Sequence, residues 1–376
     1  AEEGEAKQRE IIEEARERVE QVRDLVDLNK NPLPDPSQEI SLKRSDQFLS
    51  DSLFAVRGLL QLGDQTSSLM VDGNKTVKTD IEKKGVLFDV RGEGSKLFLK
   101  NGTLINVNNT KGYAAPIYVG DHAAFEMDGG RITHNKITWS NTYPAAPGAI
   151  YGQRGTEITI NNGLIDHNIG GPGAIYSGDF YGGLNETGPK DPGLVTINGG
   201  TIIDNWSSAE GGAILAQAGS RLDINDGLIV DNEGFVGGGI AAKDEFLYKY
   251  SNVLESEWGK VGKNYEEWLT MAKVEVNLNG GVIAGNKARS SGGGIYIATN
   301  FVNFNKTMLL DNKADQFGGG FYVSFPPYVQ QLKNLLVTEN SVSSSYVDKL
   351  GGGNGGGLWN CPTGYVHIGD GHTVYI

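Results

Sequence analysis

Residues 158–176 read ITINNGLIDHNIGGPGAIY, and this stretch decides the fold. Its first part alternates apolar and polar residues, which is typical of a short β-strand with one buried face. Asn-Gly and Gly-Gly then mark sharp corners, because these residues adopt the positive φ angles that such bends require. The stretch therefore predicts short strands joined by tight turns and does not fit a helical repeat.

The same unit recurs from about Leu97 to the C-terminus. Where no insertion interrupts it, its asparagine returns after 26 to 28 residues. The repeated asparagines are Asn135, Asn168, Asn205, Asn232, Asn286, Asn312 and Asn340. A repeat of this length built from short strands predicts one coil of a solenoid, with equivalent residues stacked in columns. We therefore expect an all-β fold, a right-handed parallel β-helix with an asparagine ladder along its axis.

The alternation of Gly-Gly-Ala-Ile with apolar-x-x-Asn resembles the repeats of the chlamydial polymorphic outer-membrane proteins and of related bacterial β-helix surface proteins. The resemblance covers about Leu97 to Tyr375. It implies a pectin-lyase-like fold and a protein that is secreted by a bacterium or displayed on its surface. It also implies a role as an adhesin or interaction domain.

An amphipathic helix and a proline-rich linker are expected in residues 1–36. The apolar face of this helix consists of Ile12, Ala15, Val19, Val22 and Val26, widened by Ile11 and Leu25. Such a stripe predicts packing against another apolar surface. The helix is expected either to fold back on the flank of the β-helix or to form a stalk or partner-binding segment.

A second helix is expected in residues 37–66, where Ser45 reads as an N-cap before an amphipathic pattern that ends near Leu60. It would cap the apolar end of the solenoid. The β-helix itself is assigned to residues 67–376, with a helical insertion at about 241–273. Strand patterns persist to Ile376, which favours a natural chain that continues.

The composition and the net charge exclude several classes of protein and of site. Glycine supplies 54 of the 376 residues without a collagen-like period, and the net charge is −13. This charge argues against a general nucleic-acid or anionic-membrane binder, and no apolar run is long enough for a membrane span. The single cysteine, Cys361, excludes an internal disulfide framework and a multi-cysteine zinc site. The N-terminus lacks the plan of a signal peptide, so the sequence reads as a mature or trimmed soluble piece.

Aromatic side chains are the candidate ligand-binding residues. Where isoleucine of Gly-Gly-Ala-Ile points inward, the next residue points outward, which predicts stacked exposed rings. Other rings lie in loops that interrupt the repeat, where they suit sugar or protein binding. The candidates are Tyr118, Tyr151, Tyr176, Trp139, Tyr143, Phe180, Tyr181, Trp206, Trp258, Trp268, Tyr296, Tyr322 and Trp359. The alternative for the strand residues is mutual ring stacking beneath a loop.

The expected function is recognition of a host glycan or an extracellular protein, and no catalytic residue is favoured. An enzyme is the alternative, because Asp204 and Asp231 precede ladder asparagines in successive coils. Their carboxylates would lie about 5 Å apart, the separation of a retaining glycosidase, although aspartate is also ordinary in turns. A helical part before a β-helix is similar to lacto-N-biosidases of gut bacteria, which implies a glycoside hydrolase. A polysaccharide lyase is the other enzyme expected on this fold.

No cofactor or metal site is predicted. His134 and His167 occupy equivalent positions but lack an obvious third ligand, and no EF-hand pattern occurs. A calcium ion held by backbone carbonyls and scattered aspartates stays an open alternative.

Overall fold

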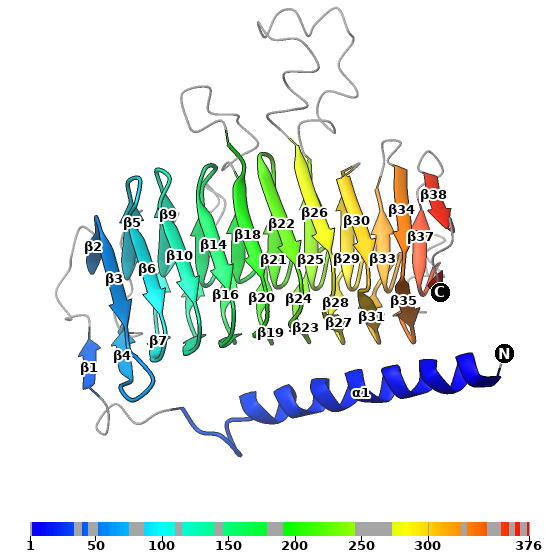
Figure 1. The fold of residues 1–376 in the computed structure, drawn as a ribbon, viewed down its shortest axis with the longest axis horizontal. Helices are drawn as coiled ribbons and strands as arrows, with labels where there is room; N and C mark the ends of the chain where they lie inside the picture. The colour runs from blue at the N-terminus through cyan, green and yellow to red at the C-terminus, as the bar shows by residue number, and fades with distance from the viewer. Residues whose placement is uncertain are drawn as a thin grey trace, which may run out of the picture.

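The computed structural model is a right-handed parallel β-helix with one long α-helix along its flank (Figure 1). The structure describes residues 2–33, 40–43, 52–74, 86–109, 115–138, 146–178, 191–244, 273–299, 301–324, 329–343, 355–360, 365–368 and 374–375. Strands of neighbouring coils pair in parallel throughout this part of the chain. The predicted fold class is confirmed.

A full coil contributes one strand to each of four parallel sheets, in the chain order C, A, D and B. Sheet C consists of β3 (Leu59–Leu62), β6 (Lys96–Leu99), β10 (Ala124–Met127), β14 (Glu157–Ile160), β18 (Gly193–Ile197), β22 (Ser220–Ile224), β26 (Val274–Leu278), β30 (Phe301–Asn305), β34 (Val329–Lys333) and β38 (Tyr365–Ile368). Sheet A consists of β1 (Ile40–Lys43), β4 (Leu69–Asp72), β7 (Thr103–Ile105), β11 (Arg131–Thr133), β15 (Leu164–Asp166), β19 (Thr201–Ile203), β23 (Leu228–Val230), β27 (Val282–Ala284), β31 (Met308–Leu310), β35 (Leu335–Thr338) and β39 (Val374–Tyr375).

The other two sheets complete the coil. Sheet D is made of short strands, β8 (Asn108–Asn109), β12 (Lys136–Ile137), β16 (Ile169–Gly170), β20 (Trp206–Ser207), β24 (Glu233–Gly234), β28 (Lys287–Ala288), β32 (Lys313–Ala314) and β36 (Ser341–Val342). Sheet B consists of β2 (Phe54–Val56), β5 (Phe88–Arg91), β9 (Ile117–Gly120), β13 (Ile150–Gly152), β17 (Ile175–Ser177), β21 (Ile214–Ala216), β25 (Ile240–Lys243), β29 (Ile295–Ala298), β33 (Phe321–Val323) and β37 (Leu358–Asn360).

The interior is filled by apolar columns. In sheet C, Phe125 pairs in register with Ile158, Ile158 with Val195, and Val195 with Leu222. All four side chains are fully or almost fully buried. Burying a side chain of this size stabilises the fold by about 1.5–3 kcal/mol, so each coil adds its own share to one continuous core.

The asparagine ladder forms as predicted. Nδ2 of Asn168 donates to Oδ1 of Asn205 at 3.0 Å, and Nδ2 of Asn205 donates to Oδ1 of Asn232 at 3.0 Å. The chain of bonds runs from Asn135 to Asn340. Because each amide also bonds backbone carbonyls, these buried polar groups are satisfied without water.

The residue before each ladder asparagine has a left-handed backbone. We call these residues the corner column, which consists of His134, His167, Asp204, Asp231, Gly285, Asp311 and Glu339. Their φ angles lie between 52° and 65°. Asp, His and Gly are among the residues that tolerate this conformation best, so the turn itself accounts for much of the composition of the column.

Helix α1 (Glu2–Val26) packs on the outward face of sheet A and runs antiparallel to the direction in which the coils stack (Figure 1). Its buried residues Ala15, Val19, Val22 and Val26 contact an apolar strip that includes Ile203, Leu228, Val230, Val282, Ala284, Met308 and Leu310. Of the two alternatives for this helix, the structure shows the folded-back one. Ile11 and Leu25 do not widen the buried stripe, since they are 44% and 54% exposed.

The second predicted helix is wrong in its described part. Phe54–Val56 and Leu59–Leu62 form β2 and β3, which pair with β5 and β6 of the next coil. The β-helix therefore begins before residue 67, and residues 44–51 lie outside the described residues. Most of the insertion at 241–273 also lies outside them, although its first residues belong to β25. Among the described residues, no helix combines the length and apolar character that a bilayer crossing requires.

Candidate functional site

The first tyrosine group on sheet B forms a column of contacting rings and is mostly buried. Ring centroids of Tyr118 and Tyr151, and of Tyr151 and Tyr176, are 5.2 Å apart. The exposure predicted for Tyr151 and Tyr176 is wrong, since they are 3% and 2% exposed. They share a cluster with Ala115, Leu215 and Ala241, and burial raises the pKa of Tyr118 to about 12. These rings act mainly as packing groups, which was the alternative to a sugar platform.

The second aromatic group lies farther along sheet B and is only half-buried. Tyr322 stacks on Trp359 with centroids 4.8 Å apart and planes 1° apart, and on Tyr296 at 5.2 Å. Phe317 contacts Trp359 at 4.8 Å with a tilted ring. Phe317 belongs to the turn between sheets D and B, where it forms a bridge with Ser291. The group therefore extends around the corner from one sheet to the other.

Sheet D adds an exposed tryptophan that is held in place by charged neighbours. Trp206 is 39% exposed, and the guanidinium carbon of Arg289 lies 4.7 Å from its ring centroid. Glu233 accepts hydrogen bonds from Nη1 of Arg289 at 2.9 Å and from Nε1 of Trp206 at 3.3 Å. Phe235, in the adjoining turn, is 51% exposed. The sequence did not single out Arg289, Phe235 or Phe317, because their contribution depends on neighbours in other coils.

We call the exposed and half-buried rings together the aromatic strip. It consists of Trp206, Phe235, Tyr296, Phe317, Tyr322 and Trp359. The remaining sequence candidates, Trp139, Tyr143, Phe180, Tyr181, Trp258 and Trp268, lie outside the described residues.

The two carboxylates of the candidate acid pair, Asp204 and Asp231, differ in their hydrogen-bond partners. Nε and Nη2 of Arg23 in α1 donate to the two carboxylate oxygens of Asp231 at 2.6 and 2.7 Å. Asp204 is half-buried, and no hydrogen bond to its carboxylate occurs within the described residues. Burial raises the pKa of Asp204, His167 opposes this rise and Asp231 adds to it. Both oxygens of the Asp231 carboxylate already accept a hydrogen bond from Arg23, which makes this carboxylate a poorer nucleophile in this state.

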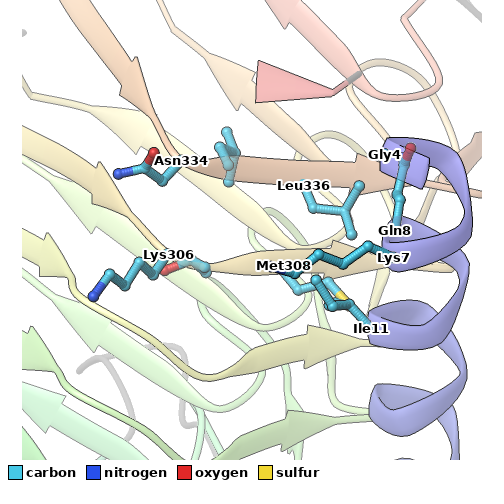
Figure 2. Close-up of a pocket in the computed structure, with 10 residues that line it drawn as sticks. Gly4, Lys7, Gln8, Ile11, Lys306, Met308, Asn334 and Leu336 are labelled. Carbon is cyan, nitrogen blue, oxygen red and sulfur yellow. The ribbon is translucent and has the colours of Figure 1, made fainter. Parts of the chain in front are cut away.

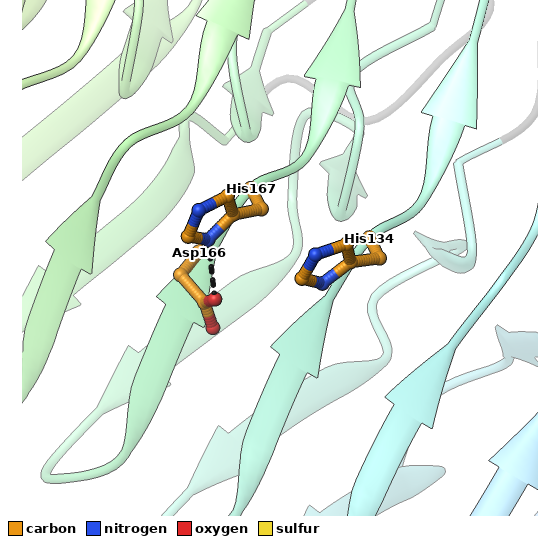
Figure 3. Close-up of side chains that lie close together, drawn as sticks. All are labelled: His134, Asp166 and His167. Atoms are coloured by element: carbon orange, nitrogen blue, oxygen red, sulfur yellow. Dashed lines mark hydrogen bonds and ion pairs between the residues drawn. The ribbon is translucent and has the colours of Figure 1, made fainter. Parts of the chain in front are cut away.

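A third cluster joins His134, Asp166 and His167, whose ligand atoms all lie within 4.8 Å of one another (Figure 3). The imidazole rings are stacked with centroids 4.8 Å apart. Asp166 is the third group that the sequence did not reveal, and it is fully buried on β15. Residue types and spacing alone gave no signal for it, since it is one of many aspartates beside a turn.

The carboxylate of Asp166 is already saturated by protein donors. Arg131 binds both oxygens at 2.8 and 2.7 Å, and Thr133 and His167 reach Oδ2 at 2.9 and 2.8 Å. Burial acts to raise the pKa of Asp166, but these hydrogen bonds outweigh it and lower the pKa. The hydrogen bond to Asp166 in turn raises the pKa of His167. A metal ion would have to displace Arg131, so the cluster fits a buried ion-pair network better than a metal centre.

No family model, no curated protein and no solved structure matches the chain. Its function is therefore inferred from the fold, from the aromatic strip and from the two groups of ionisable residues.

Proposed function

We propose that this chain is a ligand-binding β-helix of an exported bacterial surface protein, and that the aromatic strip recognises a host glycan or an extracellular protein. The exposure of Trp206, with its ring held between Arg289 and the Glu233 carboxylate, is the observation that carries the proposal. Export and surface display rest on the resemblance of the repeats to bacterial surface β-helices.

The chemistry of the strip supports this proposal. Tryptophan, tyrosine and arginine are the residues that most often dominate binding energy at interfaces. Rings that are already fixed by stacking lose little conformational freedom when a ligand binds. The ion pair between Arg289 and Glu233 fixes the Trp206 ring in the same way.

The arrangement of the strip also suits an elongated ligand. Its members come from successive coils, which are spaced by about 4.8 Å along the axis. Trp206, Phe235 and Phe317 lie on sheet D or in the turns that follow it, whereas Tyr322 and Trp359 lie on sheet B. A chain-like glycan or an extended peptide could contact several of these rings at once.

Binding assays with single substitutions test the proposal. The parent protein would be screened on a glycan array and against extracellular-matrix proteins. The affinity of every ligand found would then be measured for the parent, for Trp206→Ala and for Trp359→Ala. Removal of an anchoring ring is expected to cost about 2 kcal/mol, or roughly a 30-fold loss of affinity. Leu59→Ala is the matched control, because Leu59 is 76% exposed but lies on sheet C. Absence of any ligand in both screens, or equal loss with the control, would overturn the proposal.

A carbohydrate-active enzyme is the second candidate, and one observation favours it. Burial raises the pKa of Asp204, which lies one coil from Asp231, whose two carboxylate oxygens accept hydrogen bonds from Arg23. A carboxyl group with a raised pKa beside a second carboxylate is a feature of glycosidases. Incubation with mucin-type, milk-type and pectic oligosaccharides tests this candidate. Product release that Asp204→Asn or Asp231→Asn abolishes would favour the enzyme, whereas release that neither variant affects would exclude this pair.

A further inference from the structure

A groove of about 430 Å³ lies between the first turns of α1 and the last coils of sheet A (Figure 2). Ile11 and Lys7 approach from the helix, opposite Met308 and Leu336 of β31 and β35. Lys306 lies toward the end that is farther from the helix. A mostly apolar wall with a few polar groups, in this range of volume, is typical of a small-molecule site.

The turn that carries Lys306 departs from the pattern of the repeat. In the six preceding coils, the turn from sheet C to sheet A has a glycine at positive φ, at Gly102, Gly130, Gly163, Gly200, Gly227 and Gly281. In the next two coils the left-handed residues are Lys306, with φ 62°, and Asn334, with φ 46°. Both residues line the groove. A lysine in this conformation is strained by about 1–2 kcal/mol relative to glycine, and such strain is often kept where a side chain has a function.

The groove is also electrostatically distinct. Lys7 and Lys306 are exposed, and within the described residues neither has an ion-pair or hydrogen-bond partner. The chain as a whole has a net charge of −13. The lining of the groove contains two lysines and no carboxylate beside an apolar wall, and this combination selects for a ligand that combines negative charge with apolar surface.

We propose that this groove binds a small amphiphile with an apolar body and one anionic head group, such as an alkyl carboxylate. The apolar body packs against Ile11, Met308 and Leu336, and Lys306 contacts the head group, while Lys7 adds to the positive potential. The site lies on the helix-covered face and is separate from the aromatic strip, so the two proposals stand or fall independently.

Octanoate is the probe that tests the site. Binding to the full chain would be measured by calorimetry, together with the NMR signals of methionine methyl groups labelled with ¹³C. Octanoate is expected to move the signal of Met308 and to leave that of Met127, which is buried in the interior, unchanged. Acetate, which lacks the apolar body, and octyltrimethylammonium, which carries the opposite charge, are expected not to bind.

Variants connect the binding to the groove. Lys306→Gly is expected to raise the melting temperature by roughly 1–2 °C, because it relieves the positive φ angle. The same change is expected to weaken octanoate binding about 5-fold, which is the most that an exposed ion pair usually contributes. Ile11→Ser, at an exposed position, should weaken binding by a similar factor of about 5 through lost apolar contact. Lys313→Gln, at an exposed lysine on sheet D, is the control and should leave binding unchanged.

Three results would overturn the proposal. They are a Met308 signal that octanoate does not move, equal binding of octyltrimethylammonium and octanoate, and parental affinity in Lys306→Gly. Octanoate binding that is lost in Trp206→Ala but kept in Lys306→Gly would place the ligand on the aromatic strip instead.

Discussion

Within the described residues, the apolar side chains on two outward faces of the β-helix differ in how they are covered. On sheet A, Leu228, Val230 and Leu310 lie beneath α1 and are buried. On sheet D and the turn that follows it, Trp206 and Phe235 remain exposed. An apolar residue that points outward therefore stabilises the fold where another element such as α1 covers it, and it is available to a ligand where it stays exposed.

The largest expected effect comes from breaking the covered face. Val19 is 3% exposed and packs against sheet A. Val19→Asp places an unpaired charge there and is expected to lower the free energy of unfolding by about 3 kcal/mol. Urea denaturation would measure the change. Trp206→Ser, on the uncovered face, is expected to lower the free energy of unfolding by only about 1 kcal/mol, because it removes the contact with Arg289 and the hydrogen bond to Glu233. Equal effects of the two variants would contradict the comparison.

A smaller effect is expected at Gly285, in the corner column beneath α1. A Cβ atom there would lie 2.1 Å from Oδ1 of Asp231 and 2.8 Å from Nη2 of Arg23. Gly285→Ala is expected to lower the free energy of unfolding by about 2 kcal/mol, because the added methyl group clashes with these atoms and the positive φ angle disfavours alanine. Gly94→Ala is the control, because its φ is +76° and nothing lies within 4 Å of the added atom, so only about 1 kcal/mol is expected. Thermal unfolding of both variants would show whether the contact with α1 matters.

A pH-dependent effect is expected at His167, whose partners belong to the β-helix and not to α1. Because the bond to Asp166 raises the pKa of His167, its stabilising contribution is full below the unfolded pKa of about 6.5 and is lost as pH rises through the higher folded pKa. Between pH 6 and pH 8, the free energy of unfolding of the parent is expected to fall by up to about 1 kcal/mol more than that of His167→Gln. Urea titrations at both pH values measure the difference. Parallel profiles would show that the imidazole does not gain its proton more readily in the folded state.

The smallest effect is expected at the rim of the covered face. Arg16 forms an ion pair with Glu339 in which both side chains are largely exposed, at 41% and 48%. Arg16→Gln is expected to lower the free energy of unfolding by less than about 0.5 kcal/mol, because water screens such pairs. Its comparison with Val19→Asp separates the apolar contribution of α1 from the charged one. A loss above about 1 kcal/mol in urea denaturation would assign the docking of α1 mainly to ion pairs.

Much of the fold could be predicted, and particular residues show why. The ladder asparagines recur with the period of a coil, and the pairs Phe125–Ile158 and Ile158–Val195 repeat one apolar position. Every repeat predicts the same local conformation, so the fold prediction rests on many separate observations. The segment Phe54–Leu62 has no such support. Its apolar spacing fits a helix, but pairing with Phe88 and Leu97 in the next coil makes it strand.

The candidate sites were less predictable. Strand alternation correctly directs the side chain of Tyr151 away from the interior core, but its neighbours Tyr118, Tyr176 and Leu215 bury it. The partner of Asp231 is Arg23, which lies 208 residues earlier in the chain. No local pattern contains such a contact.

The sequence by itself determined the coil, the ladder and the columns, because these depend on short-range turn and alternation rules that are repeated many times. Only the tertiary structure decided which outward residues are covered, which carboxylates are clamped and where a groove opens. Those features depend on contacts between coils and with α1, whose partners are distant in sequence, and exposure is a property of the assembled surface and not of any single strand.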